Sequence, residues 1–510
     1  MKYREGKLIF ADLEQINSFF SILEENKEKI KKEEEKIEYF QPLINLLTQT
    51  LKSYHFANNS KIIKEAIKKR ENSFCVNYDE KLIEENSLKE VINIDCIRAQ
   101  IQIHERIIDN LNKKNIQILF QSKELIKSEK IYNEIVKVRR EIHMCPELGD
   151  EEHETSKKIK KYVADLGLKY KEVAGTGVLV TIENGEGPVV ATRADIDALP
   201  ILEENDVPYK SKNAGKMHAC GHDAHTSIQL GVAKILAENK DKWSGTVKFL
   251  FQPAEETEGG AQRMIDEGVL QNPQVDAIFA LHMAPEIETG KIGIKYGKVH
   301  ASSAWFQINI HGVSSHGALP HRGIDAILIA TKVVEYLQSI ISRRIDPREE
   351  AVITVGSIHG GNVGNIICDS VEMKGTIRAV SPEIRSMIVD MIHSKLPLFV
   401  ESLDGTADIS TSIGYDSVIN NYEKTKQVEE NIIDLFGEEA LEIIEKPRLD
   451  VEDFSYFLQN VEGCFYRLGT RNVEKDTVYE LHHPKFNIDE DSLKIGIELQ
   501  LKNIMELLKK

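Results

Sequence analysis

Glycine and proline are distributed very unevenly along this chain of 510 residues. The first 130 residues contain one of the 31 glycines and one of the 14 prolines, and all the others lie further on. Glycine and proline interrupt helices and form turns, so a segment without them that is rich in Lys, Glu, Ile and Leu is typical of helices. We therefore expect an all-α extension over residues 1–128, and no combination of residues within it indicates catalysis.

From about residue 129 the sequence alternates between apolar, β-branched runs and amphipathic stretches. The runs at Val178–Ile182, Val189–Thr192, Val247–Phe251 and Ala277–Leu281 are typical of buried strands, and Thr226–Glu238 is typical of a helix. Strands that alternate with helices predict an α/β sheet covered by helices on both faces.

Residues 302–413 show a different order of elements. A strand and a helix are followed by two further strands and a second helix, which predicts a compact α+β unit. We expect this smaller unit to be inserted into the α/β domain, which would then comprise residues 129–301 and 414–510.

Composition argues against several classes of protein. The net charge of -17 makes nucleic acid or an anionic membrane improbable as a partner, and no apolar run approaches the ~20 residues that span a bilayer. The six cysteines form no C-x-x-C pair, so a disulfide framework is not expected. The first residues show no secretory signal, and we therefore expect a cytoplasmic protein.

Several predicted strands lead directly into side chains that bind metals. Ligands of open α/β sheets collect at the carboxyl ends of the strands, so these side chains are expected to converge. Thiolate, imidazole and carboxylate groups together form a mixed set that suits divalent transition metals. Each motif is weak alone, and the combination carries the prediction. The residues concerned are Asp195, Asp197, Cys220, His222, Glu255, Glu256, His282, His482 and His483.

Motifs in a fixed order make residues 130–510 resemble one enzyme family. They are similar to the amidohydrolase branch of the aminoacylase/carboxypeptidase-type dinuclear metallopeptidases, which includes hippurate hydrolases, N-acyl-amino-acid amidohydrolases and auxin-conjugate hydrolases. The motifs include Arg-Ala-Asp-Ile-Asp-Ala-Leu-Pro at 193–200, His-Ala-Cys-Gly-His-Asp-Ala-His at 218–225, Phe-Gln-Pro-Ala-Glu-Glu at 251–256, Gly-Val-Ser-Ser-His-Gly at 312–317 and Leu-His-His-Pro at 481–484. The extension lies outside this resemblance.

The resemblance implies a metal centre with a role for each residue. Two divalent metal ions per chain, Zn²⁺ or Mn²⁺, would hold a water between them. Glu255 would act as the general base, and Asp197 would orient a metal ligand. The ligands that the resemblance implies are Cys220, His222, Glu256, His282 and His482.

The inserted unit resembles the lid or dimerisation domain of the same family. His316 matches a histidine that stabilises the oxyanion, often across a dimer, so we expect a homodimer. Asn365 and Arg378 are candidates for binding the carboxylate of a substrate, and a purely structural role fits either residue equally well.

The leading prediction is metal-dependent hydrolysis of the amide bond in N-acyl amino acids or related small conjugates. A dipeptidase or aminopeptidase on the same scaffold is the nearest alternative, because its metal chemistry would be identical. A binding or scaffold protein without catalysis is the third reading. The complete set of expected ligands together with Glu255 argues against it.

Overall fold

The structure, a computed structural model, describes residues 2–4, 7–9 and 129–508. The rest of the predicted all-α extension lies outside the described residues. Its described part is a pair of antiparallel strands, β1 (Lys2–Arg4) and β2 (Lys7–Ile9), where helix was expected. In the sequence, Glu5 and Gly6 separate these two short runs, and a glycine between two runs favours a turn. No helix in the described ranges is long and apolar enough to cross a membrane.

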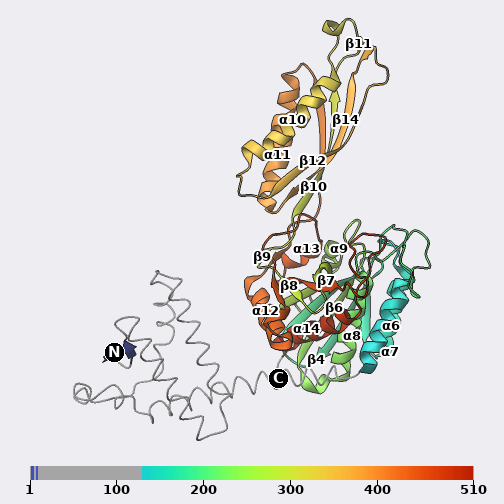
Figure 1. Cartoon of the computed structure of the whole chain (residues 1–510), viewed down its shortest axis with the longest axis vertical. Helices are drawn as coiled ribbons and strands as arrows, with labels where there is room; N and C mark the ends of the chain where they lie inside the picture. Colours follow the sequence, from blue (N-terminus) through green and yellow to red (C-terminus); the bar gives the residue numbers. More distant parts are fainter. Residues whose placement is uncertain (1, 5–6, 10–128, 509–510) are drawn as a thin grey trace. The chain divides into compact units, whose positions relative to one another are not determined.

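An eight-stranded mixed sheet forms the centre of the α/β part (Figure 1). Its central strands are β5 (Val189–Asp195), β6 (Gly245–Gln252), β7 (Ala277–Glu288) and β18 (Gly463–Arg471). Neighbouring strands among these four run parallel, so their carboxyl ends lie at the same edge. Both β5 and β6 are buried along their whole length, as expected for strands covered on both faces.

The outer strands complete the sheet. They are β3 (Lys169–Val173), β4 (Gly177–Asn184), β8 (Ile292–Ile294) and β17 (Leu441–Ile443), in the overall order β17-β8-β18-β7-β5-β6-β4-β3.

Helices pack against both faces of this sheet, as the sequence predicts. One hydrophobic core lies between the sheet and the larger helices, and a second lies between the sheet and two short helices. The larger helices are α6 (Glu129–His143), α7 (His153–Asp165), α8 (His222–Glu238), α12 (Tyr422–Phe436) and α14 (Asp491–Leu507), and the short ones are α9 (Ala261–Asp266) and α13 (Phe454–Leu458). Nearly every residue of α8 is buried, so polar side chains at its start are enclosed by protein.

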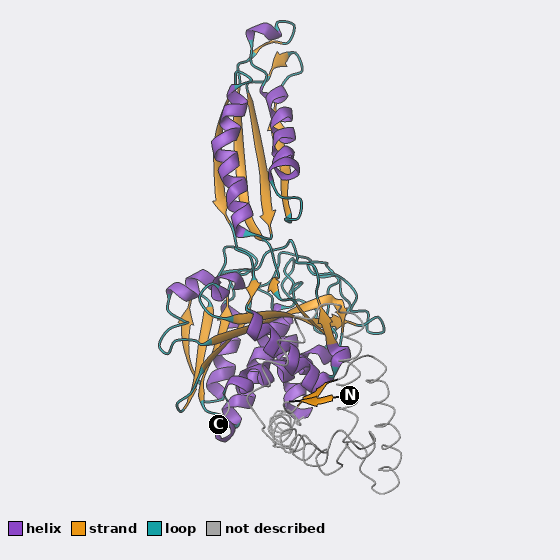
Figure 2. Cartoon of the chain, turned by 90° about the vertical axis from the view of Figure 1, so that its left-hand side faces the viewer, coloured by secondary structure: helices purple, strands orange, loops and turns teal. Residues whose placement is uncertain are grey.

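Residues 302–413 form a separate antiparallel sheet of four strands in the order β12-β14-β10-β15. Two long helices run along its strands (Figure 2) and share one hydrophobic core with one face of the sheet. The strands are β10 (Ser302–His311), β12 (Ala351–Gly360), β14 (Ser370–Ala379) and β15 (Thr406–Ile413), and the helices are α10 (Ala326–Arg344) and α11 (Pro382–Glu401). The expected elements are present, and β15 is an additional strand. The division into domains at the predicted boundaries stays a prediction.

Candidate metal centre and active site

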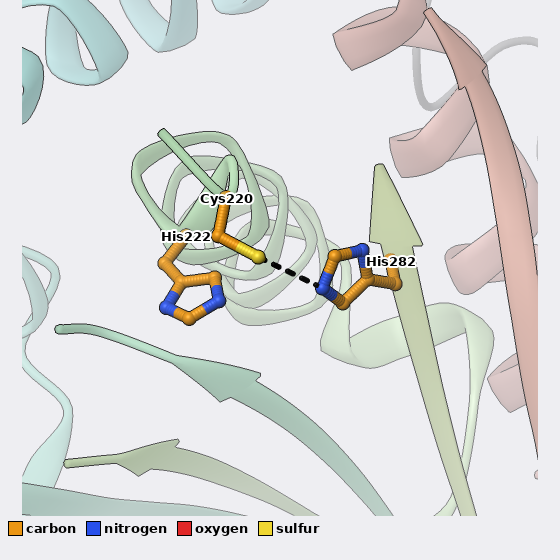
Figure 3. Close-up of side chains that lie close together, drawn as sticks. All are labelled: Cys220, His222 and His282. Atoms are coloured by element: carbon orange, nitrogen blue, oxygen red, sulfur yellow. Dashed lines mark hydrogen bonds between the residues drawn. The ribbon is translucent and has the colours of Figure 1, made fainter. Parts of the chain in front are cut away.

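A tight turn presents Cys220 and His222 at the start of α8. The residue between them, Gly221, has a φ of 89°, and a Cβ at this position would lie 2.7 Å from Cγ of Met283. A side chain would therefore be strained and would also collide with Met283. The glycine of the Cys-Gly-His triplet lets both neighbouring side chains lie close to His282 (Figure 3).

His282 lies inside strand β7 and not after its end. The sequence predicts that the strand stops at Leu281, but β7 continues to Glu288 because β18 pairs with it in parallel through this stretch. Nδ1 of His282 donates a hydrogen bond to the carbonyl oxygen of Met283 at 2.9 Å. This bond leaves Nε2 without a proton, and Nε2 lies 3.5 Å from Sγ of Cys220.

The loop after β5 carries Asp197, whose oxygens contact two other members of the site. Its carbonyl oxygen lies 2.9 Å and its Oδ1 3.2 Å from Nδ1 of His222. Its Oδ2 accepts a hydrogen bond of 2.9 Å from the backbone N–H of Glu256. Asp197 therefore fixes the ring of His222 with Nε2 free, and it also fixes the backbone of Glu256. This arrangement is typical of residues that orient metal ligands.

The structure brings all five predicted ligands into one cluster. The ligand atoms of Cys220, His222 and His282 lie within 4.8 Å of one another, and the same limit holds for Cys220, Glu256 and His482. The carboxylates of Glu255 and Glu256 form a third such group with His222. His482 reaches the cluster from a loop near the end of the chain, where its backbone N–H donates to the carbonyl oxygen of Ala219 at 2.8 Å.

Two unpartnered atoms show that this cluster fits a cation. Nε2 of His222 and Oε1 of Glu256 are buried and have no hydrogen-bond partner, although Oε1 lies 3.2 Å from Nε2 of His482. An unsatisfied buried polar group costs about 1–3 kcal/mol, and a bound divalent cation would satisfy both atoms. Burial and the neighbouring carboxylate of Glu256 raise the pKa of the Cys220 thiol, so a cation would also be needed to hold the thiolate.

Glu255 is buried next to the cluster, and the pKa of its carboxyl group is shifted in the opposite direction from that of Glu256. Burial and the nearby carboxylates of Glu452 and Glu256 raise the pKa of Glu255 well above its ordinary value. A carboxylate with a raised pKa binds a proton more readily, which is the property required of a general base near neutral pH.

A buried network of charges lies behind the site, and the sequence singled out only one of its members, Asp195, as a metal-binding candidate. Arg193 contacts Asp195 at 2.7 Å, Glu452 at 2.8 Å and Asp453 at 2.9 Å, and all four side chains are almost completely buried. Asp195 in turn lies 2.5 Å from Nδ1 of His225, which directs the other ring nitrogen to the backbone N–H of Met283. The signal was present, since an arginine inside an apolar strand predicts a buried ion pair.

The three candidates in the inserted unit do not join this cluster. His316 is exposed in the short strand β11 (Ser315–His316), where its Nδ1 accepts a hydrogen bond from the N–H of Ala318 at 3.0 Å. Asn365 lies close by, and its carbonyl oxygen accepts from the N–H of Gly317 at 2.7 Å. Among the described residues, no hydrogen bond or ion pair connects either residue, or Arg378, to the predicted ligands.

Arg378 lies on β14 with one nitrogen unpartnered. Its Nη1 is buried without a hydrogen-bond partner, and its guanidinium lies 5.8 Å from the centre of the Trp305 ring. Burial lowers the pKa of Arg378 from its ordinary value. A buried guanidinium nitrogen with a free N–H is able to donate a hydrogen bond to a carboxylate.

Known proteins match both the fold and the sequence of this chain. The family model of peptidase family M20/M25/M40 matches residues 191–506, and the chain belongs to this family. An IAA-amino acid hydrolase of Arabidopsis thaliana (ILR1-like 2) is 39% identical over 399 residues, which cover 77% of this chain and 89% of that protein. The N-acetyl-L-cysteine deacetylase of Bacillus subtilis is 38% identical over 363 residues, which cover 71% and 85%.

A solved structure extends the match to three dimensions. It is a dinuclear metal-binding peptidase of the M20 family from Bacillus subtilis, 31% identical, and it covers 75% of this chain and 99% of its own with a TM-score of 0.65. The predicted family resemblance and mixed α/β fold are therefore confirmed. The chain is an enzyme, an amidohydrolase or peptidase of the M20 family.

Proposed function

We propose that this protein hydrolyses the amide bond of N-acyl amino acids or related small conjugates with the help of two divalent cations. The observation that carries the proposal is the convergence of five ligand side chains beside one further buried carboxylate, Glu255. The names of the two relatives support the substrate class, because both refer to small amino-acid derivatives. The dinuclear metal-binding relative supports the number of cations.

The cation ligands would be the side chains that the sequence singles out. When bound, cations such as Zn²⁺ or Mn²⁺ lower the pKa of water and polarise the carbonyl group that is attacked. Asp197 orients His222 and the backbone of Glu256 through the contacts described above. The proposed ligands are Cys220, His222, Glu256, His282 and His482.

Glu255 moves the proton in this proposal. Its carboxylate takes a proton from the attacking water and returns it to the nitrogen of the leaving amine. Glu256 is directed at His482, and its Oε1 lacks a hydrogen-bond partner, which suits a ligand and not a proton carrier. The two adjacent glutamates thus have separate tasks.

The inserted unit would complete the site in a homodimer. We assign to His316 the stabilisation of the negative charge that develops on the carbonyl oxygen, from the partner chain. Asn365 and Arg378 would bind the carboxylate of the substrate, and the free Nη1 of Arg378 supports this role. All three remain proposals, because their contacts lie within the inserted unit.

Paired substitutions of the two glutamates test the proposal. Glu255→Gln should abolish turnover while the metal content stays near that of the wild type, whereas Glu256→Gln should lose both metal and activity. The measurements are turnover of N-acetyl and N-benzoyl amino acids and metal analysis of the same samples. If Glu255→Gln kept more than a few per cent of the wild-type rate, its assignment as the base would be wrong.

A peptidase is the second candidate, because the structurally similar relative is described as one. A panel of dipeptides measured beside the N-acyl amino acids separates the two. A higher kcat/KM for dipeptides would replace the amidohydrolase proposal with a dipeptidase.

A further inference from the structure

We propose that Tyr415 is a positioning residue for Glu255, and that it ties the turn carrying Glu255 to the strands that join the inserted unit to the α/β domain. This inference rests on the proposed function of Glu255 as the base. Tyr415 follows β15 in the connection that leads back to the α/β domain. No motif in the sequence drew attention to it.

The hydroxyl group of Tyr415 is bound to the backbone of the base itself. Its Oη lies 2.8 Å from the carbonyl oxygen of Glu255 and 3.1 Å from that of Thr257. Carbonyl oxygens only accept, so the single hydroxyl proton is shared between them. Both carbonyls belong to the turn that follows β6 and carries the two glutamates.

The other side of this turn is held by carboxylates. Oε1 of Glu152 accepts from the N–H of Ala254 at 2.8 Å, and Oδ2 of Asp197 accepts from the N–H of Glu256 at 2.9 Å. These bonds hold the backbone N–H groups of the two residues that flank Glu255. The peptide carbonyl of Glu255 points to Tyr415, so the hydroxyl completes the set of contacts that hold the turn.

The ring of Tyr415 packs between Gly259 and the ring of Tyr456. Gly259 has a φ of +79°, and a Cβ on it would lie 2.9 Å from Cε1 of Tyr415. The ring also packs edge to face on Tyr456, with the ring centres 6.1 Å apart. Tyr415 is therefore held in one orientation toward the turn and does not merely lie near it.

The backbone of Tyr415 connects the same residue to the inserted unit. Its carbonyl oxygen accepts from the N–H of Ser303 at 2.9 Å and from Nη1 of Arg385 at 3.3 Å. Ser303 is the second residue of β10, the strand that enters the unit, and Arg385 lies on α11. A displacement of β10 or α11 would consequently move the hydroxyl that holds Glu255.

Replacing Tyr415 by phenylalanine removes the hydroxyl and leaves the ring. A small displacement of a catalytic group lowers the rate steeply, and we expect kcat to fall about 10- to 100-fold. KM and metal content should stay within about twofold, because the base acts in the transition state and the ligands are unchanged. The matched control is Tyr456→Phe, which removes a hydroxyl from the adjacent ring and should leave kcat near the wild-type value.

A double substitution shows whether Tyr415 acts through Glu255. If it does, Tyr415→Phe should cost much less in a Glu255→Asp background than in the wild type, since the base is already displaced. Backbone amide exchange at Thr257 and Gly259 should also be faster in Tyr415→Phe, and this measurement does not depend on activity.

These measurements test the role of Tyr415 separately from that of Glu255. Wild-type kcat in Tyr415→Phe, additive effects in the double substitution, or a joint loss of metal and thermal stability would overturn the inference. If Glu255→Gln is inactive in the same assays, the proposed function stands without it. An active Glu255→Gln would instead refute the proposed function itself.

Discussion

Replacing Asp197 by asparagine tests how the backbone and the ligands of the metal centre are held together. The carboxylate of Asp197 accepts from the backbone N–H of Glu256 at 2.9 Å, and its Oδ1 lies 3.2 Å from Nδ1 of His222. An asparagine keeps the size of the side chain but has one oxygen in place of two. Its NH₂ group must face one of these two donors, so one of the two contacts is lost.

The magnitude follows from the kind of bond that is lost. A hydrogen bond to a charged group contributes about 1.5–3 kcal/mol, and about 1.4 kcal/mol corresponds to a factor of ten in an equilibrium constant. The carbonyl oxygen of Asp197 still accepts from His222 at 2.9 Å, which limits the damage to that ring. We expect the dissociation constant for the metal to rise about 10- to 100-fold, as for other residues that orient ligands.

Competition with a chromophoric chelator measures this change, with Zn²⁺ and Mn²⁺ titrated separately. The control is Asp206→Asn, which makes the same chemical change at an exposed position of the same segment and should bind metal like the wild type. A dissociation constant of Asp197→Asn within about threefold of the wild type would refute the reasoning, because the lost contact would then carry no binding energy.

Three further predictions concern the same centre. His482→Ala should lose metal and activity, whereas His483→Ala should be mild because the ring of His483 stacks on Tyr479 at 4.7 Å; the reverse result in metal analysis would exchange their roles. Mixing His316→Ala with Glu255→Gln should restore part of the activity if His316 serves the partner's site, and no rescue after verified subunit exchange would exclude that arrangement. Removal of metal by a chelator should lower the melting temperature, and restoring Zn²⁺ at 100 times its dissociation constant should stabilise the fold by about 2.7 kcal/mol; an unchanged melting curve would show that the cation does not bind the folded state.

Part of this fold can be read from the sequence because burial leaves a regular pattern. β5 and β6 lie inside the sheet and are buried along their whole length, so more than half of their residues are apolar and both strands are visible in the sequence. β15 was missed because alternate residues of this strand, including Asp408 and Ser410, are polar and exposed. A strand with one open face carries only half of the apolar signal.

The side chains that lie together in the cluster could also be singled out in the sequence, because they follow strands or occupy short motifs. The triplet around Gly221 is local: the conformation that places Cys220 and His222 depends on the glycine between them. The sequence placed His282 just after its strand, but β7 continues past His282 because β18 pairs with it there.

The sequence by itself determined the α/β sheet and singled out the candidate ligands, while the separate tasks of the two adjacent glutamates stay a prediction. Only the tertiary structure decided what holds them. Arg193 meets Glu452 across 259 positions of the chain, and the hydroxyl of Tyr415 meets the carbonyl of Glu255 across 160. The physical reason is that a hydrogen bond forms only when the donor–acceptor distance is right to within a few tenths of an ångström and the donor points at the acceptor. The order of residues does not specify such distances between distant segments until the sheet has brought those segments together.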